Sequence, residues 1–348
     1  MVETTSFILA KYGGLKELEK FSQALQYLFN QKKEKKPNLA EFKIPNKLND
    51  LSNFFPLFKF IYQLTDDELS VSYVTEFIIH DFARDGVKYL ELRSNPRKND
   101  ENGMTKDSYV RTVTSIIQKF PHSECDIIVR LILSINRRST LEEAMEILNL
   151  AIKYKEFGVV GVDLCGDPKV GHIDNIKLVF IKAKSYGLKV TLHLGEAEET
   201  IPEHASMLSI APDRIGHAAH LDPESKLCIF SNNIPIEMCM TSNVVCNIVK
   251  NYKEHHIKDF LYDNHPCCLS TDDKGVFFSN LSTEYSIAAS TFSLSPKQLF
   301  DLSYRCINYI FESENVKENL RKVWNNWFNA YHLSILDENG SNVKNPIL

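Results

Sequence analysis

Short apolar runs alternate with longer amphipathic stretches along this chain. The runs are rich in Val, Ile and Leu and predict buried strands, whereas the stretches between them have the helical period. The predicted strands are residues 87–93, 127–135, 159–164, 189–194, 214–217, 235–241 and 267–270. The predicted helices include residues 141–156, 174–185, 296–311 and 314–327. This alternation is typical of a parallel sheet built from βαβ units.

Each predicted strand is followed by polar or charged residues at its carboxyl end. In a (β/α)8 barrel the active site is built from those strand ends. We therefore predict an α/β fold of the (β/α)8 TIM type that lacks one strand. No linker rich in Pro, Gly or Ser divides the chain, so we expect a single domain over residues 1–335 and a polar C-terminal tail over 336–348.

Composition narrows the class of protein. With 40 Lys and Arg against 45 Asp and Glu, the net charge of −5 argues against a nucleic-acid partner bound by a broad basic face. No apolar run approaches the roughly 18 residues of a membrane helix, and the N-terminus does not resemble a signal peptide. The 8 cysteines form no C-x-x-C pair. We expect a cytoplasmic monomer with neither a membrane nor a nucleic-acid partner.

Two histidines and a glutamate lie at the ends of adjacent predicted strands. His193 and Glu196 close the run TLHLGE, and His217 closes RIGH. A neutral imidazole at a strand end can bind a metal, and a neighbouring glutamate can transfer a proton. The alternative for His193 and Glu196 is a hydrogen-bonded core histidine beside a solvated glutamate.

Asp272 and Asp273 follow the last predicted strand. Adjacent carboxylates repel, so keeping both ionised requires a cation or hydrogen-bond donors nearby. One could bind a metal while the other contacts a substrate, and an ordinary turn or helix N-cap is the alternative. After the first predicted strand, the rigid turn at Pro96 presents Arg97 and Lys98, which suit a phosphate group or form a basic surface turn.

The combination is more informative than any single residue. Two histidines, one glutamate and an aspartate pair all follow strands at the carboxyl end, where the active site of a barrel lies. Residues placed at random would not favour that end. The pattern predicts a barrel hydrolase that uses a metal-activated water.

The same residues resemble the adenosine deaminase family. HLGE, RIGHA, PIEMCMTSNV and STDDKGVF occur in the order and spacing of that family. DGVKYLELRSNPR, GMTK, GDPKVG, EYSIAASTF and DLSYRCINYIF are most similar to the branch that acts on N6-methyl-AMP. The resemblance extends from about residue 55 to residue 324.

The resemblance implies a zinc barrel that hydrolyses the C6 substituent of a purine nucleotide. His193 and Asp272 match zinc ligands. Glu196 matches the acid that protonates purine N1, and His217 matches the residue that orients the zinc-bound water and helps to take its proton. Asp273 matches a carboxylate that contacts the purine and helps to place the water. The other implied substrate contacts are Gly166 for the purine, and Asn95, Pro96, Arg97 and Lys98 for the 5′-phosphate.

The sequence departs from the family in its metal ligands. The family carries a His-x-His pair on the first strand, and no two histidines here are separated by one residue. His255 and His256 are adjacent in a helix-like stretch and do not substitute for the pair. Asn136 stands where the branch tends to carry an acid. By resemblance, residues 4–12 match the helix after the missing strand, although 6–10 also reads as a strand.

These departures leave three hypotheses open. The first is a zinc-dependent deaminase that converts N6-methyl-AMP to IMP and methylamine. The second is an inactive, truncated variant that at most binds purine nucleotides. The third is an adenosine deaminase that acts on the nucleoside. In each case a missing strand would leave unpaired sheet edges at 87–93 and 267–270.

Overall fold

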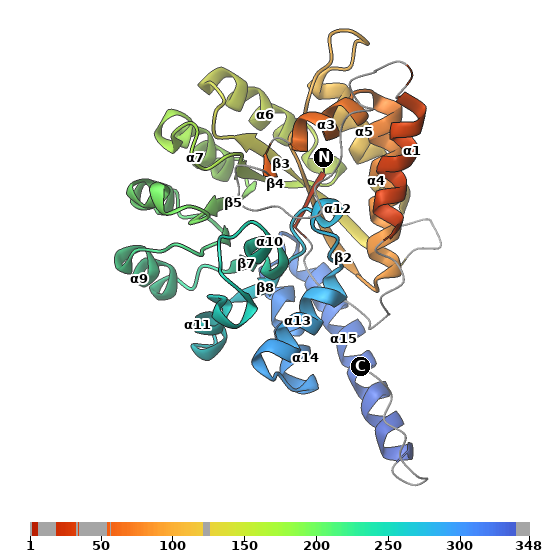
Figure 1. Cartoon of the computed structure of the whole chain (residues 1–348), viewed down its shortest axis with the longest axis vertical. Helices are drawn as coiled ribbons and strands as arrows, with labels where there is room; N and C mark the ends of the chain where they lie inside the picture. Colours follow the sequence, from red (N-terminus) through yellow and green to blue (C-terminus); the bar gives the residue numbers. More distant parts are fainter. Residues whose placement is uncertain are drawn as a thin grey trace.

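The computed structural model describes residues 2–5, 19–32, 34, 54–55, 57–120 and 126–338. Seven parallel strands, β2 to β8, lie side by side in chain order and curl into a half-barrel with helices around it (Figure 1). The strands are β2 (Tyr89–Ser94), β3 (Ile128–Asn136), β4 (Val159–Cys165), β5 (Lys189–Leu194), β6 (Arg214–His217), β7 (Ile236–Met238) and β8 (Cys267–Leu269). The predicted α/β barrel-type fold and its seven strands are confirmed.

The strand predicted over 235–241 ends earlier than expected, at Met238. From Cys239 onward the backbone carbonyls accept helical hydrogen bonds, the first of them from Asn243 N to Cys239 O at 3.0 Å. This short helix, α10 (Met240–Val245), begins inside the apolar run. It turns the chain across the carboxyl end of the sheet immediately after β7.

An additional strand covers one edge of the sheet. β1 (Val2–Thr5) pairs antiparallel with β2, with Val2 opposite Ser94 and Thr5 opposite Glu91. The expected unpaired edge at β2 is therefore wrong, because β1 satisfies the backbone groups there. The helix expected over 4–12 is wrong for Thr4 and Thr5, and residues 6–10 lie outside the described residues. Within the described ranges, no strand pairs with the outer edge of β8.

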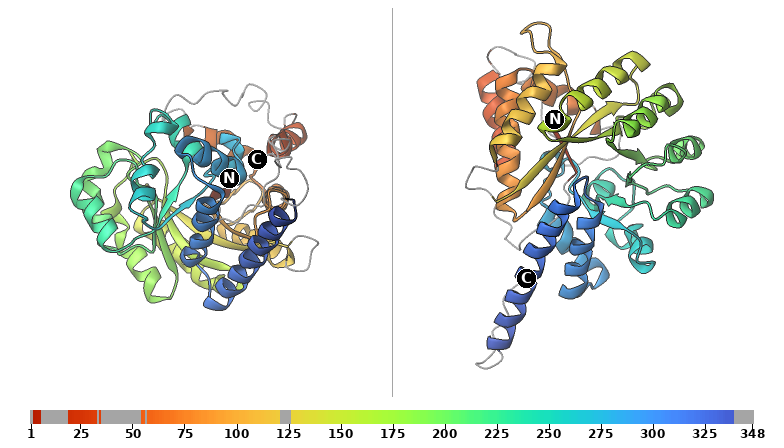
Figure 2. Two further views of the ribbon diagram at one scale, coloured as in Figure 1. Left: turned by 90° about the horizontal axis from the view of Figure 1, so that it is seen from below. Right: turned by 180° about the vertical axis from the view of Figure 1, so that it is seen from behind.

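Helices surround the sheet, and the long last helix projects from the body (Figure 2). They are α1 (Glu19–Lys32), α3 (Leu57–Leu64), α4 (Glu68–Arg84), α5 (Lys106–Lys119), α6 (Leu141–Lys153), α7 (Lys177–Ser185), α8 (His204–Leu208), α9 (Pro223–Ser231), α10, α11 (Ile257–Tyr262), α12 (Lys274–Phe277), α13 (Leu281–Phe292), α14 (Pro296–Cys306) and α15 (Glu314–Glu338). α6, α7, α14 and α15 correspond to the four predicted helices. α15 continues past the predicted end at residue 327 into the first residues of the expected tail.

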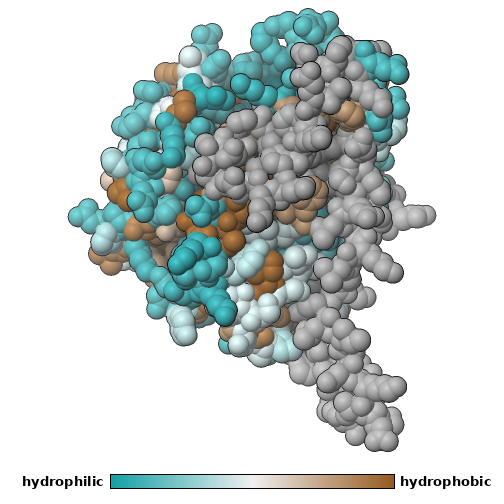
Figure 3. Space-filling view, in the orientation of Figure 1, coloured by the Kyte–Doolittle hydropathy of each residue, from teal (hydrophilic) through white to brown (hydrophobic). Residues whose placement is uncertain are grey.

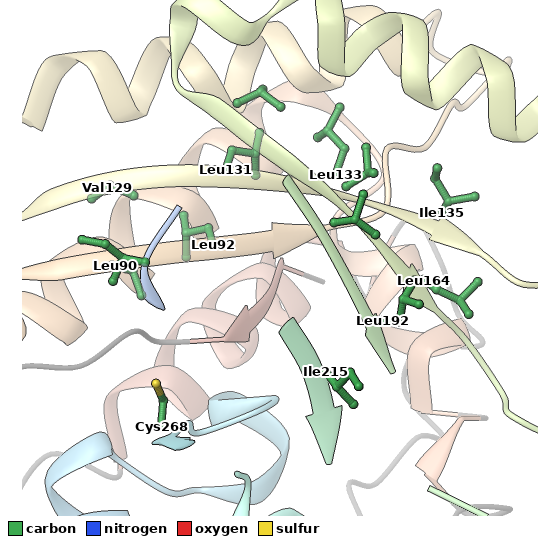
Figure 4. Close-up of a cluster of buried hydrophobic side chains, with 14 of the residues drawn as sticks. Leu90, Leu92, Val129, Leu131, Leu133, Ile135, Leu164, Leu192, Ile215 and Cys268 are labelled. Atoms are coloured by element: carbon green, nitrogen blue, oxygen red, sulfur yellow. The ribbon is translucent and has the colours of Figure 1, made fainter. Parts of the chain in front are cut away.

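The core lies between the sheet and these helices. Apolar side chains of adjacent strands, among them Leu92, Leu131 and Leu133, pack together within it (Figure 4). The cysteines at 165, 228, 239, 246, 267, 268 and 306 are free thiols, and all but Cys228 are buried. The coloured part of the surface in Figure 3 is mostly hydrophilic, with small apolar patches. None of the helices in the described ranges has the length and apolar character required to cross a membrane.

Candidate active site

Four of the predicted side chains meet at the carboxyl ends of β5, β6 and β8. His217 Nε2 lies 3.4 Å from Glu196 Oε1 and 3.9 Å from Asp272 Oδ2. The ring centroids of His193 and His217 are 5.4 Å apart. His193 and Glu196 are half-buried, as is Asp272, whereas His217 is buried. The sheet thus brings together residues that lie far apart in the sequence.

The backbone at this site is held in unfavourable conformations. His217 and Asp272 have positive φ angles of 63° and 54°, which are uncommon for residues other than glycine. Gly195 has a φ of +77°, and a Cβ there would lie 3.1 Å from the His220 carbonyl oxygen. Such strain concentrates at functional sites, where the surrounding structure holds it in place.

A buried carboxylate orients the ring of His193. Its Nδ1 lies 3.0 Å from Asp163 Oδ1 and 2.8 Å from the Leu164 carbonyl oxygen. Both partners are acceptors, so Nδ1 carries a proton and Nε2 is the atom left to bind a metal. Burial disfavours the charged ring, but the Asp163 carboxylate outweighs it and holds the pKa of His193 well above its ordinary value.

Asp163 is itself one end of a chain of alternating charges inside the barrel. Arg93 lies 3.5 Å from Asp163 and 2.6 Å from Glu237. Arg214 lies 2.8 Å from Glu237 and 2.6 Å from Glu91. All five side chains are buried. Burial would raise the pKa of Glu237, but the two guanidinium groups overcome it and lower that pKa from 4.5 to about 2.

Neutral groups surround His217 on the side away from the carboxylates. Its Nδ1 lies 2.9 Å from the side chain of Asn243 on α10, and the same amide lies 3.2 Å from His255 Nε2. His256 Nε2 donates to the backbone oxygen of His217 at 2.7 Å. The two histidines do not lie in a helix as expected, but between the 3-10 turn Tyr252–Glu254 and α11.

A set of metal donors converges at the same place. One ligand atom each from His217, Cys239 and Asp272 lies within 4.8 Å of the other two. His193 lies on the adjoining strand, with its ring centroid 5.4 Å from that of His217. Burial and the carboxylates nearby hold the pKa of the Cys239 thiol well above its ordinary value. Imidazole, cysteine sulfur and carboxylate are nevertheless the donor types that zinc takes, so the residues present fit the metal that the family resemblance implies.

Comparison with known proteins identifies the family. The family model described as adenosine deaminase matches residues 25–327. The chain belongs to the adenosine deaminase family. By this membership it is a hydrolytic deaminase, as the sequence predicted.

Several deaminases are similar over most of the chain. The N6-methyl-AMP deaminase of Danio rerio is 43% identical over 285 residues, covering 79% of this chain and 81% of that protein. The Homo sapiens enzyme is 41% identical over 288 residues, covering 80% and 81%. The crystal structure of Arabidopsis N6-mAMP deaminase superimposes with a TM-score of 0.83 at 36% identity, covering 88% of this chain and 93% of that one. These findings confirm the resemblance recognised in the sequence.

Two further residues expected of an adenosine deaminase follow β8 and β4. Asp273 is buried at the start of α12, next to Asp272. Gly166 follows β4 with a φ of +102°, and a Cβ there would lie 2.7 Å from the Asn136 amide. Glycine therefore adopts this conformation beneath Asn136 without the strain that another residue would bring.

The predicted phosphate segment separates into two different environments. Arg97 Nη2 donates to Thr65 Oγ1 at 2.8 Å, and its guanidinium lies 4.1 Å from the centre of the Tyr62 ring. Its Nε and Nη1 are buried and have no hydrogen-bond partner among the described residues. Lys98 instead points into solvent and pairs with Asp100 at 2.9 Å. Asn95 is half-buried, and its amide lies 3.9 Å from a cysteine sulfur. Pro96 is buried.

Sequence reasoning missed the residues that support the two histidines. Cys239 and Asn243 lie in the run PIEMCMTSNV but have no assignable role from spacing. Arg93, Asp163 and Glu237 are charged residues inside apolar strands. That placement is itself a signal, because buried charges require partners.

Proposed function

We propose that this chain hydrolyses N6-methyl-AMP to IMP and methylamine in nucleotide metabolism. The main support is the cluster of His193, Glu196, His217 and Asp272 at the ends of the strands. These residues match the catalytic residues of the family. The chain is also 43% identical to an N6-methyl-AMP deaminase. Solved structures of an Arabidopsis relative hold IMP or GMP, which supports a purine nucleotide as ligand.

Zinc is the proposed cofactor, held by His193 and Asp272 with Cys239 nearby as a further donor. When bound, zinc lowers the pKa of water so that hydroxide is available near neutral pH. A catalytic zinc usually has about three protein ligands. The sequence has no His-x-His pair, so His193, Asp272 and Cys239 are the donors that we propose for the zinc.

The side chains supply the remaining chemistry. Glu196 protonates purine N1, so that the charge that builds up in the ring is neutralised as water attacks C6. His217 orients that water, and Asp273 and the backbone of Gly166 contact the purine. The C6–N bond then breaks, and the exocyclic nitrogen leaves with a proton as methylamine.

The segment Asn95 to Lys98 is proposed to hold the 5′-phosphate, with Arg97 as its main contact. Two guanidinium nitrogens of Arg97 lack partners among the described residues, and a phosphate would satisfy them. Asp100 already neutralises Lys98 in solvent, so we assign Lys98 a smaller part.

The first experiment measures the zinc content of the purified chain together with methylamine release from N6-methyl-AMP. We expect about one zinc per chain and turnover that a chelator abolishes and added zinc restores. A chain that releases no methylamine with zinc bound contradicts the proposed activity, and turnover without any metal contradicts the cofactor.

The second experiment replaces Arg97 by alanine. Losing a charge-assisted hydrogen bond of about 1.5–3 kcal/mol should lower kcat/KM for N6-methyl-AMP roughly 10- to 100-fold and leave nucleoside turnover unchanged. Lys98→Ala is the matched control and should change little. If nucleotide and nucleoside turnover fall equally, the enzyme recognises the nucleoside and not its phosphate.

A nucleotide-binding protein without turnover is the second candidate. The absence of the His-x-His ligands from the sequence favours it. It predicts that IMP binds the metal-free chain with an affinity that Arg97→Ala reduces, while methylamine release stays absent at every zinc concentration.

A further inference from the structure

A buried ion pair joins the chain after β3 to the chain after β5. Arg137 directly follows β3, and Glu203 is the last residue of the 3-10 turn Glu198–Glu203 that follows β5. Arg137 Nη2 donates to both carboxylate oxygens of Glu203, at 2.7 and 2.8 Å, and both side chains are buried. Since β4 lies between β3 and β5 in the sheet (Figure 1), the ion pair spans the carboxyl end of β4. Such a pair often stabilises a fold no more than apolar residues of the same size would, so what it holds in place matters more than its energy.

The ion pair holds the far end of the loop that follows β4, residues 166–173, which we call the β4 loop. The last amide of this loop, Ile173 N–H, donates to Glu203 Oε2 at 3.0 Å. Gly171 packs so closely against the carbonyl oxygen of Arg137 that a Cβ would have no room there. Both members of the ion pair therefore contact this end of the loop.

The near end of the β4 loop is held by the same stretch of chain. The Arg137 amide donates to the carbonyl oxygen of Cys165, the last residue of β4, at 2.9 Å. The side chain of Asn136 lies against Gly166, where a Cβ would come within 2.7 Å of it. Residues 169–172 between the two ends are exposed. The position of the loop thus depends on its two ends, and Arg137 contacts both.

We propose that Arg137 and Glu203 are positioning residues that hold the β4 loop so that the backbone of Gly166 meets the purine. The inference rests on the proposed function, in which Gly166 contacts the base. The guanidinium group fixes the Glu203 carboxylate, and the carboxylate fixes the Ile173 amide. Without this attachment the loop can shift, and a small displacement of a group that positions a substrate is enough to weaken its contact.

Two double variants separate this positioning role from a purely structural one. Arg137→Met/Glu203→Met removes the ion pair and the acceptor for Ile173 N–H, and it leaves no buried charge unpaired. Arg137→Met/Glu203→Gln also removes the ion pair, but its side-chain amide oxygen can still accept from Ile173. Both lack the charges, so a difference between them reports on the attachment of the loop. Urea unfolding establishes that both variants fold.

The first measurement is residue-resolved hydrogen exchange in the full-length chain without ligand. We expect the Ile173 amide to exchange faster in the first double variant than in the wild type, with an intermediate rate in the second. The amides of β3 and β5 should keep their wild-type rates. Unchanged exchange at Ile173 in the first variant overturns the proposal. This readout requires neither zinc nor turnover, so it does not depend on the proposed function.

The second measurement is the affinity for IMP by calorimetry. The first double variant should bind IMP about 3- to 10-fold more weakly than the wild type, which is the loss expected for one hydrogen bond. The second double variant should recover part of that affinity. Unchanged affinity in the first variant overturns the inference alone. A wild-type chain that binds no IMP contradicts the proposed function, and the inference about the purine falls with it.

A second ion pair between the same two segments provides the matched control. Lys169 in the β4 loop lies 2.9 Å from Glu199 in the 3-10 turn, and both side chains are exposed. Lys169→Met/Glu199→Met therefore removes an ion pair that joins the same loop to the same turn without touching Ile173. We expect wild-type exchange at Ile173 and wild-type affinity for IMP. Equal changes in this control and in the first double variant overturn the proposal, because any link between the two segments would then have the same effect.

Discussion

His193 and His217 lie on adjacent strands with ring centroids 5.4 Å apart, but different kinds of groups support them. Behind His193 lies the charged chain that begins at Asp163. Behind His217 lies an uncharged amide, followed by an imidazole that burial keeps neutral. A carboxylate at Nδ1 makes Nε2 more electron-rich, which suits a metal ligand. A neutral amide at Nδ1 adds no charge beside the ring, which suits a residue that orients a water rather than one that binds the metal.

The network of charged residues behind His193 also contributes more to the stability of the fold than the neutral residues behind His217. Glu237 bridges Arg93 and Arg214, and all three side chains are buried. Removing one partner from such a network leaves uncompensated buried charge, which typically costs about 3–5 kcal/mol. Asn243 and His255 behind His217 are neutral, so a substitution there leaves no buried charge unpaired.

Glu237→Leu should therefore give the largest effect. We expect the free energy of unfolding in urea at pH 7 to fall by about 3–5 kcal/mol relative to the wild type. The pKa of Glu237 is depressed from 4.5 to about 2, so its contribution is present above 4.5 and is lost as the pH falls towards 2. The difference between the two proteins should narrow over that interval. A constant difference would contradict an ionised Glu237.

The second prediction is that Asp163→Asn weakens metal binding. The asparagine cannot supply the negative charge at His193 Nδ1, and loss of such a support typically costs about 10- to 100-fold in metal affinity. Competition with a chromophoric chelator measures the zinc affinity directly. Asp222→Asn is the matched control, because Asp222 lies 3.3 Å from Nδ1 of a different histidine, His204. Equal losses of zinc affinity in both variants would show that the effect is not specific to the carboxylate that contacts His193.

The sequence predicts the strands and the site residues that a local pattern of residues identifies. The seven strands were recognisable because buried parallel strands are apolar throughout, and the strand ends placed His193 and His217 in one site. β1 was not recognisable, because Val2–Thr5 (VETT) carries no periodic signal and pairs with an edge far along the chain. The early end of β7 was missed because the apolar run continues into α10.

The residues that hold the rings of His193 and His217 in place could not be predicted from the sequence. Arg93 and Glu237 are 144 positions apart, and their contact depends on how the sheet curls. Asn243 and His255 are neutral residues with no characteristic spacing. Their role follows from a hydrogen-bond pattern that only the three-dimensional arrangement defines. Metal ligands and acids are recognisable by residue type, whereas the groups that orient them are not.

The smallest effect is expected from Thr191→Val, which tests whether charge is what matters in the network around His193. Thr191 Oγ1 donates to Glu237 Oε1 at 3.0 Å, the same oxygen that Arg214 Nε reaches at 2.8 Å. The variant removes a neutral donor and leaves the guanidinium groups in place, so we expect a loss of about 1 kcal/mol in urea unfolding and unchanged zinc affinity. Thr75→Val is the matched control, because it removes a buried hydroxyl bond within α4 and should cost a similar amount. If Thr191→Val instead destabilised the chain as much as Glu237→Leu, the hydroxyl and not the paired charges would hold Glu237 in place. The contrast between the charged and the neutral support would then no longer explain how the two histidines differ.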